Sequence, residues 1–214
     1  MGEHTAFFYG TLMAPPVLHR VIYGTTTPEP WQSSLTTVRP ALLQGYTRHK
    51  VKHADYPAIL PHSTTPPEKE PSTPLPSVRG TLVTGLTDGD IWRLDIFEGD
   101  QYTRQKVRVQ ILKDTALDEV VDEKDLEAHV QGEAEAETYI WTSPRGELES
   151  EEWDFEMFKR EKMWAWVGQA RSDGVEVDEG FGDVDRAVRE GSRDPTGGRG
   201  AGGRITRELE RAAV

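Results

Sequence analysis

The sequence contains no cysteine at any of its 214 positions. This absence excludes disulfide bonds, thiol nucleophiles and metal sites built on thiolates. Basic residues are also few, because 25 Lys and Arg stand against 37 Asp and Glu, which gives a formal net charge of −12. Nucleic-acid binding requires a basic surface, so the charge balance argues against a nucleic-acid partner.

Long hydrophobic runs are absent as well. No apolar stretch approaches the ~20 residues that span a bilayer. The N-terminal residues Met1–His4 are not a basic segment followed by an apolar one, as a signal peptide would require. Gly2 fits the start of the N-myristoylation pattern, but Ala6 stands where that pattern requires Ser or Thr. We therefore expect no membrane association and a cytoplasmic location.

Three stretches have the composition of loops or tails. Residues 61–77 contain six prolines, and residues 114–137 carry ten acidic side chains against one basic residue, Lys124. We interpret both as loops, the second as a solvated excursion in preference to a metal site, since no spaced ligand pattern supports a metal. Residues 168–214 hold half of the glycines and a single aromatic residue, Phe181. We expect one domain over 1–167 and a mostly disordered tail over 168–214, with a short helix near its end at 205–213.

The remaining segments alternate between strand and helix patterns. Alternating apolar and polar residues over 102–112 give the clearest strand. Shorter apolar runs predict the other strands, and spaced apolar residues predict helices, with Thr87 or Asp88 as the N-cap of the second helix. The expected strands are 5–9, a region over 38–51 that Gly45 interrupts, 58–60, 78–86 and 138–141, and the expected helices are 13–22, 88–97 and one from Ser150 to a C-cap at Gly168. We expect the last helix to pack an aromatic stripe on the sheet, formed by Trp153, Met157 and Trp164 and widened by Phe158, Ala165 and Trp166.

The first candidate site is the segment Tyr9-Gly10-Thr11-Leu12, which ends the predicted strand over 5–9. A glycine at this point lets the backbone turn and approach a ligand closely. Successive backbone N–H groups in such a turn can hold an anion without a charged side chain.

The second candidate site is Glu98, between a predicted helix and the strand that begins at Tyr102. The bulky side chains of Phe97 and Tyr102 are expected to bury the Glu98 carboxyl group and raise its pKa, which suits a general acid/base. A surface glutamate paired with Arg104 is the alternative. His49 and His53 have the spacing of metal ligands on a helix, but the sequence around them predicts strand and loop, so we expect no metal site.

Taken in order, these motifs resemble the gamma-glutamylcyclotransferase superfamily, specifically its AIG2-like branch. The resemblance covers roughly residues 5–166. It rests on the order and spacing of Tyr9-Gly10-Thr11-Leu12, Gly45-Tyr46, Tyr56-Pro57-Ala58, Gly80, Phe97-Glu98-Gly99 with Tyr102 and Arg104, and Thr138-Tyr139-Ile140-Trp141 followed by Glu152-Trp153-Asp154-Phe155-Glu156.

The resemblance implies an α+β fold, a small mixed β-barrel of five or six strands with flanking helices and a pocket at one end. It implies that the backbone amides of Tyr9, Gly10, Thr11 and Leu12 hold the substrate's α-carboxylate. It further implies that Glu98 is the catalytic acid/base and that Tyr102 lines the substrate pocket, with Tyr46 and Tyr56 as further lining residues.

The implied reaction is the release of 5-oxoproline from a small gamma-glutamyl compound, without a metal or other cofactor. The substrate's own α-amine is the nucleophile, so the protein needs to supply orientation and one proton carrier. Two alternatives remain at this point. One is a binding module that keeps the carboxylate-holding loop without catalysis, and the other is an interaction protein that uses the acidic loop and the tail.

Overall fold

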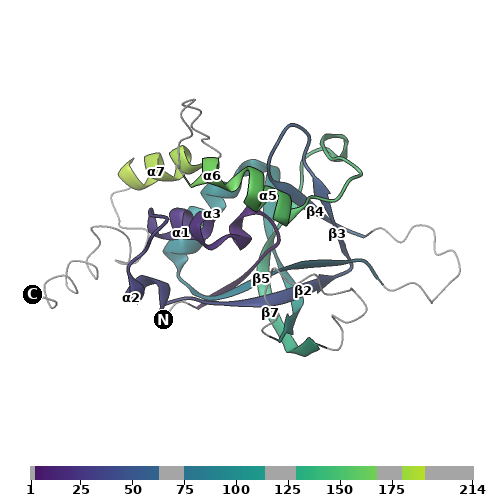
Figure 1. Cartoon of the computed structure of the whole chain (residues 1–214), viewed down its shortest axis with the longest axis horizontal. Coiled ribbons are helices and arrows are strands. Elements are labelled where there is room, and N and C mark those ends of the chain that lie inside the picture. The colour runs from purple at the N-terminus through teal and green to yellow at the C-terminus, as the bar shows by residue number, and fades with distance from the viewer. Residues whose placement is uncertain (1–2, 63–74, 114–128, 168–179, 191–214) are drawn as a thin grey trace, which may run out of the picture.

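The alternating segment after Glu98 forms strand β6 (Tyr102–Leu112) in a computed structural model of the chain, which describes residues 3–62, 75–113, 129–167 and 180–190. Five strands close into a barrel in the order β1-β5-β2-β6-β7 (Figure 1). Strands β1 and β7 run parallel, and all other neighbouring pairs run antiparallel. The other barrel strands are β1 (His4–Phe8), β2 (Thr37–Gln44), β5 (Ser77–Leu86) and β7 (Val130–Trp141). The expected α+β fold with a small mixed barrel is confirmed, with five strands.

Strand β7 corrects the extent of the acidic loop. We expected a loop over 114–137, but residues 130–137 belong to β7 and pair with residues 106–112 of β6. Acidic residues alternate here with small apolar ones, and they face the basic residues of β6, as in the ion pair of Lys106 with Glu135 at 3.1 Å. Three of the acidic residues that suggested a solvated excursion, Glu133, Glu135 and Glu137, are thus cross-strand partners. The other residues of that loop, 114–128, lie outside the described residues, as does most of the Pro-rich loop.

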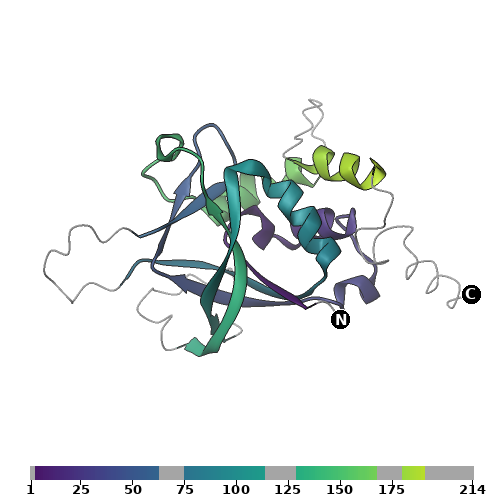
Figure 2. The same cartoon turned by 180° about the vertical axis from the view of Figure 1, so that it is seen from behind.

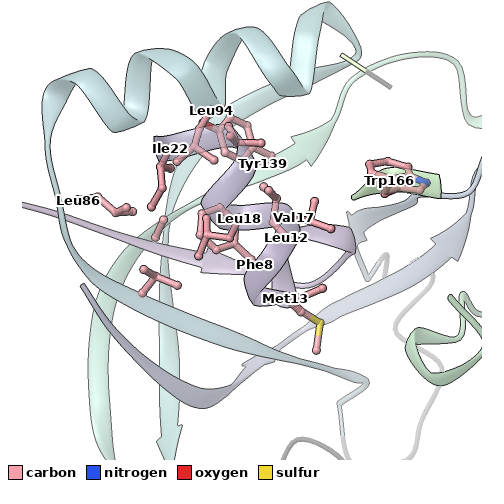
Figure 3. Packing of buried hydrophobic residues seen from close by; sticks show 14 of the residues in the cluster. Phe8, Leu12, Met13, Val17, Leu18, Ile22, Leu86, Leu94, Tyr139 and Trp166 are labelled. Carbon is pink, nitrogen blue, oxygen red and sulfur yellow. The ribbon is translucent and has the colours of Figure 1, made fainter. Parts of the chain in front are cut away.

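Strand β1 is buried on both of its faces, because it separates two apolar clusters. Phe7 packs inside the barrel, whereas Ala6 and Phe8 pack against the helices outside it. Figure 3 shows Phe8 in this outer cluster. Helix α1 (Pro15–Tyr23) covers this outer face together with α3 (Asp88–Glu98). This two-sided burial explains why the first strand reads as a continuous apolar run in the sequence.

Helix α3 begins and ends as its sequence predicts. The Thr87 hydroxyl accepts a hydrogen bond from the Asp90 amide, and the Asp90 carboxylate accepts one from the Thr87 amide in return. This reciprocal cap fixes the start of the helix. Its C-cap residue, Gly99, has a φ of +67°, a conformation that favours glycine. The cap therefore places Glu98 in the last position of the helix.

The remaining elements are a separate small sheet and several short helical segments. A two-stranded sheet of β3 (Tyr46–Lys50) and β4 (Pro57–Pro61) projects beside the barrel, and Gly45 with a φ of +77° separates β3 from β2 as expected. The short helical elements are η1 (Thr11–Met13), α2 (Pro30–Ser33), η2 (Gly99–Gln101), η4 (Arg145–Glu147), α5 (Phe155–Glu161) and α6 (Met163–Trp166). Within the described parts of the chain, no helix is both long enough and apolar enough to cross a membrane.

The long helix expected from Ser150 is wrong in its start and its continuity. Helix α5 begins after Asp154, whose carboxylate accepts hydrogen bonds from two backbone amides and so acts as the N-cap. The helix then breaks at Lys162, so α5 and α6 are separate. Of the two tryptophans of α6 expected in the stripe, Trp166 is buried and Trp164 is not. The expected C-cap, Gly168, lies outside the described residues.

Part of the predicted tail is an ordered helix. Residues Phe181–Glu190 form α7, which packs beside α3 and α1 (Figure 2). Phe181, the single aromatic residue of this segment, is 6% exposed and belongs to the same apolar cluster as α1. The helix expected near 205–213 lies outside the described residues.

Candidate active site

A cavity of about 150 Å³ opens at the end of the barrel where β1 and α3 terminate. It brings together all six residues expected at the site, although they come from segments almost ninety residues apart. These are Tyr9, Gly10, Thr11 and Leu12 from the segment after β1, and Glu98 and Tyr102 from the end of α3 and the start of β6. The cavity therefore joins the two candidate sites into one.

The loop after β1 turns sharply at Gly10 and enters η1. A Cβ atom on Gly10 would lie 2.8 Å from Cγ of Pro57, so only glycine fits between the loop and β4. The amides of Thr11 and Leu12 are the first N–H groups of the η1 turn and have no partner within it. Both residues line the cavity, so a carboxylate placed there meets the positive end of the turn.

Arg48 of β3 contacts the start of the Tyr9–Leu12 segment and does not itself line the cavity. Its guanidinium group donates a hydrogen bond to the Tyr9 carbonyl at 3.1 Å and pairs with the Glu152 carboxylate at 2.8 Å. It also lies over the Trp153 ring, 5.7 Å from the centroid. Arg48 therefore ties the end of β1 to the segment that precedes α5.

The Glu98 carboxylate has no hydrogen-bond partner among the described residues, although it is largely enclosed by protein. Loss of solvation, together with the negative charge of Asp95, raises the pKa of Glu98 to about 8. A carboxyl group with such a pKa exchanges a proton readily near neutral pH. Glu98 is half-buried, and Phe97 and Tyr102, which were expected to bury it, line the same cavity.

Three tyrosine hydroxyls surround Glu98, and each donates its proton elsewhere. Tyr9 donates to the Tyr139 carbonyl at 2.6 Å, Tyr102 to the Pro57 carbonyl at 3.0 Å, and Tyr139 to the Asp95 carboxylate at 2.8 Å. Burial raises the pKa of all three phenols, so they stay neutral. Because their protons are committed to fixed acceptors, the Glu98 carboxylate is left available to a ligand.

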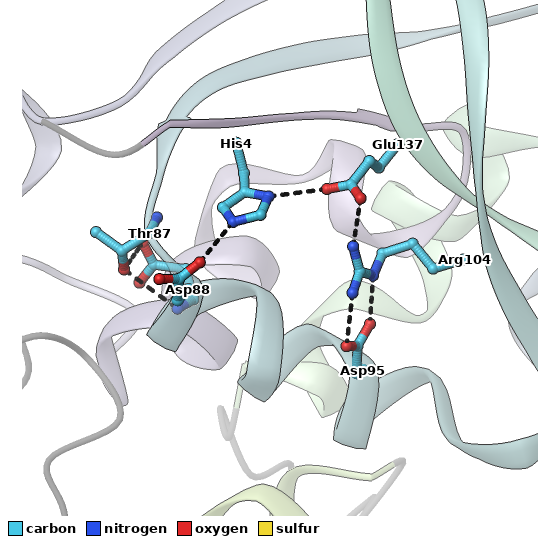
Figure 4. A network of polar contacts seen from close by, with 7 residues as sticks. His4, Thr87, Asp88, Asp95, Arg104 and Glu137 are labelled. Carbon is cyan, nitrogen blue, oxygen red and sulfur yellow. Dashed lines mark hydrogen bonds and ion pairs between the residues drawn. The ribbon is translucent and has the colours of Figure 1, made fainter.

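A chain of charged side chains runs behind this wall to the surface (Figure 4). Arg104 forms two hydrogen bonds with the Asp95 carboxylate, at 2.8 and 3.2 Å, and pairs with Glu137 on β7. Glu137 in turn contacts His4 at 3.0 Å, and the other ring nitrogen of His4 lies 2.7 Å from Asp88. The alternative that Arg104 pairs with Glu98 is wrong, because Arg104 holds Asp95 instead.

The segments that form the cavity also match a known protein family. The family model for gamma-glutamyl cyclotransferase, AIG2-like, matches residues 6–155. This span includes both the Tyr9–Leu12 segment and Glu98. The chain belongs to this gamma-glutamyl cyclotransferase, AIG2-like family. The resemblance expected from the motifs is thereby confirmed.

Several named relatives of this family come from Arabidopsis thaliana. Protein AIG2 C is 28% identical over 157 residues, which cover 73% of this chain and 73% of the relative. AIG2-like protein C is 30% identical over 159 residues, which cover 74% and 71%. A solution structure of another Arabidopsis thaliana protein is 28% identical, covers 73% of both chains and superposes with a TM-score of 0.44.

The structure adds residues to this AIG2-like site that the sequence did not indicate. Asp95 lies one turn before Glu98 on α3, and that spacing of three residues was the available signal. Tyr139 and Trp166 also line the cavity, but their role depends on strand register and helix packing that a single sequence does not give. Of the two further tyrosines named in the motifs, Tyr56 lines the cavity and Tyr46 does not.

Proposed function

We propose that this AIG2-like protein is a gamma-glutamylcyclotransferase that releases 5-oxoproline and an amine from a small gamma-glutamyl compound. The observation that carries the proposal is the Glu98 carboxylate, which has no hydrogen-bond partner among the described residues and shares one cavity with the residues of the η1 turn. The family match supports the general class of reaction.

The η1 turn has the chemistry to hold the substrate's α-carboxylate. The N–H groups of Gly10, Thr11 and Leu12 supply the donors, and Tyr102 closes the opposite wall. Glu98 then faces the α-ammonium group, whose positive charge favours the ionised form of Glu98. Holding the glutamyl chain folded between these groups brings the α-nitrogen near the γ-carbonyl carbon, so most of the rate enhancement comes from orientation.

Glu98 carries the proton during ring closure. The carboxylate accepts one proton from the α-ammonium group, and the freed amine attacks the γ-carbonyl carbon to form the new C–N bond. The protonated Glu98 then donates to the leaving nitrogen as the original C–N bond breaks, and the leaving amine takes up the second proton lost by the ring nitrogen. A pKa of about 8 suits this task, because it lies closer to that of an ammonium group than an ordinary carboxyl group does.

The direct test is the detection of 5-oxoproline by mass spectrometry across a panel of gamma-glutamyl amines and dipeptides. Glu98→Gln keeps the shape of the side chain and removes the proton carrier, so we expect a loss of kcat of about a hundredfold or more. Asp100→Asn is the matched control, because Asp100 is exposed, lies two residues further and does not line the cavity. Full activity of Glu98→Gln would disprove the acid/base assignment.

The competing proposal is a module that binds gamma-glutamyl compounds without turning them over. In this proposal the same turn holds the substrate's α-carboxylate, but Glu98 transfers no proton and no 5-oxoproline forms. Saturable binding of gamma-glutamyl amides to the native protein, with no 5-oxoproline from any member of the panel, would favour this alternative.

A further inference from the structure

Two residues of the cavity wall, Trp166 and Gly180, come from beyond residues 6–155, the span that the family model matches. Trp166 is the last residue of α6, and Gly180 immediately precedes α7. Figure 3 shows Trp166 at one end of the apolar cluster that joins α1 and α3. The cavity of this chain is therefore completed by a segment outside the matched domain.

Helix α7 is tethered by a paired arginine. The Arg20 guanidinium group on α1 donates two hydrogen bonds to the Asp185 carboxylate, at 3.0 and 2.6 Å. The same group lies over the Phe181 ring, 5.4 Å from its centroid. A two-bond pair combined with a ring contact fixes both the position and the rotation of the helix.

The start of α7 presses on the end of α3, which carries Glu98. Gly180 has a φ of +88°, and a Cβ atom there would lie 2.9 Å from the Phe97 carbonyl oxygen. Phe181 packs on the Phe97 ring at 5.1 Å and on the Trp166 ring at 6.0 Å between centroids. Trp166 in turn meets Phe97 edge-on at 6.3 Å. These three rings and Gly180, which together we call the aromatic wall, lie next to the proposed acid/base.

The charges around the cavity restrict what this wall can accept. Among the described lining residues, Glu98 alone is ionisable near neutral pH, and none is Lys, Arg or His. An anionic group on the leaving amine would find no counter-ion among these lining residues. An apolar group would instead bury its surface against Phe97 and Trp166.

We propose that Trp166, held in place by Gly180 and Phe181, selects gamma-glutamyl compounds whose leaving amine carries an uncharged, apolar group. The inference rests on the proposed function and adds to it the element that determines which amine is released. With the α-carboxylate in the η1 turn and the γ-amide at Glu98, the proposal places the leaving group against the aromatic wall.

The test compares gamma-glutamylbenzylamide, which has an apolar leaving amine, with gamma-glutamylglycine, which has an anionic one. We expect kcat/KM to favour the benzylamide by about tenfold or more. Trp166→Ala should bring the ratio toward one, and Trp166→Phe should keep it, because the ring is retained. Trp164→Ala is the matched control, since Trp164 lies on the same helix and lines a different surface groove.

A second variant keeps the cavity residues intact. Asp185→Asn removes the ionic tether of α7 at a half-exposed position, and we expect it to lower the benzylamide preference in the same direction as Trp166→Ala. Circular dichroism and thermal melting show whether each variant is folded. A native preference for gamma-glutamylglycine, or equal effects of Trp166→Ala and Trp164→Ala, would overturn the inference.

Binding separates this inference from the proposed function. Titration calorimetry on Glu98→Gln measures dissociation constants for both intact amides, and we expect the same preference for the benzylamide. If that preference exists but the native protein releases no 5-oxoproline, the proposed reaction is wrong and the selective wall stands. If 5-oxoproline is released but the two amides bind equally, or neither binds, the wall is wrong and the reaction stands.

Discussion

Replacement of Glu98 by Gln is expected to stabilise the folded protein in alkaline solution while it removes catalysis. The folded chain keeps a proton on Glu98 up to about pH 8, whereas an ordinary glutamate in the unfolded chain releases it near 4.5. Between these two values the unfolded state binds fewer protons, so the stability of the native protein falls as the pH rises. The glutamine side chain of the variant does not titrate, so the variant does not lose stability in this way as the pH rises.

The magnitude follows from the size of the pKa difference. A rise from 4.5 to about 8 corresponds to an upper limit of about 5 kcal/mol above pH 8. Solvent reaches the carboxylate through the cavity and screens part of this cost, so we expect about 2–3 kcal/mol. For a chain of this size, that is a difference in Tm of roughly 5–10 °C.

The assay is thermal or urea unfolding of the native protein and Glu98→Gln, at pH 5 and at pH 8.5. At pH 5 the two proteins should be nearly equally stable, and at pH 8.5 the variant should be the more stable. Asp100→Asn removes the same charge at an exposed neighbouring position and should not reproduce the change between the two pH values. A stability difference that is independent of pH would refute the assignment of a buried, proton-retaining carboxyl group to Glu98.

Two further predictions concern the surroundings of the site. Because the Asp95 charge raises the pKa of Glu98, Asp95→Asn should move the midpoint of the pH–kcat/KM profile below 8 by about half to one pH unit, and Asp100→Asn should leave it unchanged. Gly80→Ala should destabilise the barrel by about 3 kcal/mol in urea unfolding, because its Cβ would overlap the Phe8 carbonyl oxygen of β1, whereas Gly132→Ala on β7 meets no atom within 4 Å and should be nearly neutral.

The sequence predicts the barrel strands best where alternation and burial agree. Strand β6 matches its predicted bounds of 102–112, because its apolar residues lie on one face and its polar residues on the other. The predicted strand at 138–141 is too short, because residues 130–137 also belong to β7. The acidic residues in this part of β7 face basic residues of β6, which the local sequence of β7 does not indicate. Pairing between strands is information that a local pattern does not contain.

The residues of the site likewise fall into those that a local motif predicts and those that it does not. Glu98 and the segment after β1 are predictable because each is a local motif at the end of an element. Helix α7 was not predictable from its glycine-rich surroundings, because its partners Arg20 and Phe97 lie far away in sequence. Tertiary contacts of this kind stabilise short helices whose local sequence favours a coil.

Tyr139 explains why the two halves of the site act as one. Its backbone carbonyl accepts the hydrogen bond of Tyr9, the residue that begins the carboxylate-holding loop, and its side-chain hydroxyl donates to Asp95 on the helix that carries Glu98. The parallel pairing of β1 with β7 places this residue between the loop and the helix end. A single strand position therefore sets the distance between the proposed carboxylate site and the proton carrier. We therefore expect a change that shifts β7 relative to β1 to alter the proposed carboxylate binding and the proposed proton transfer together.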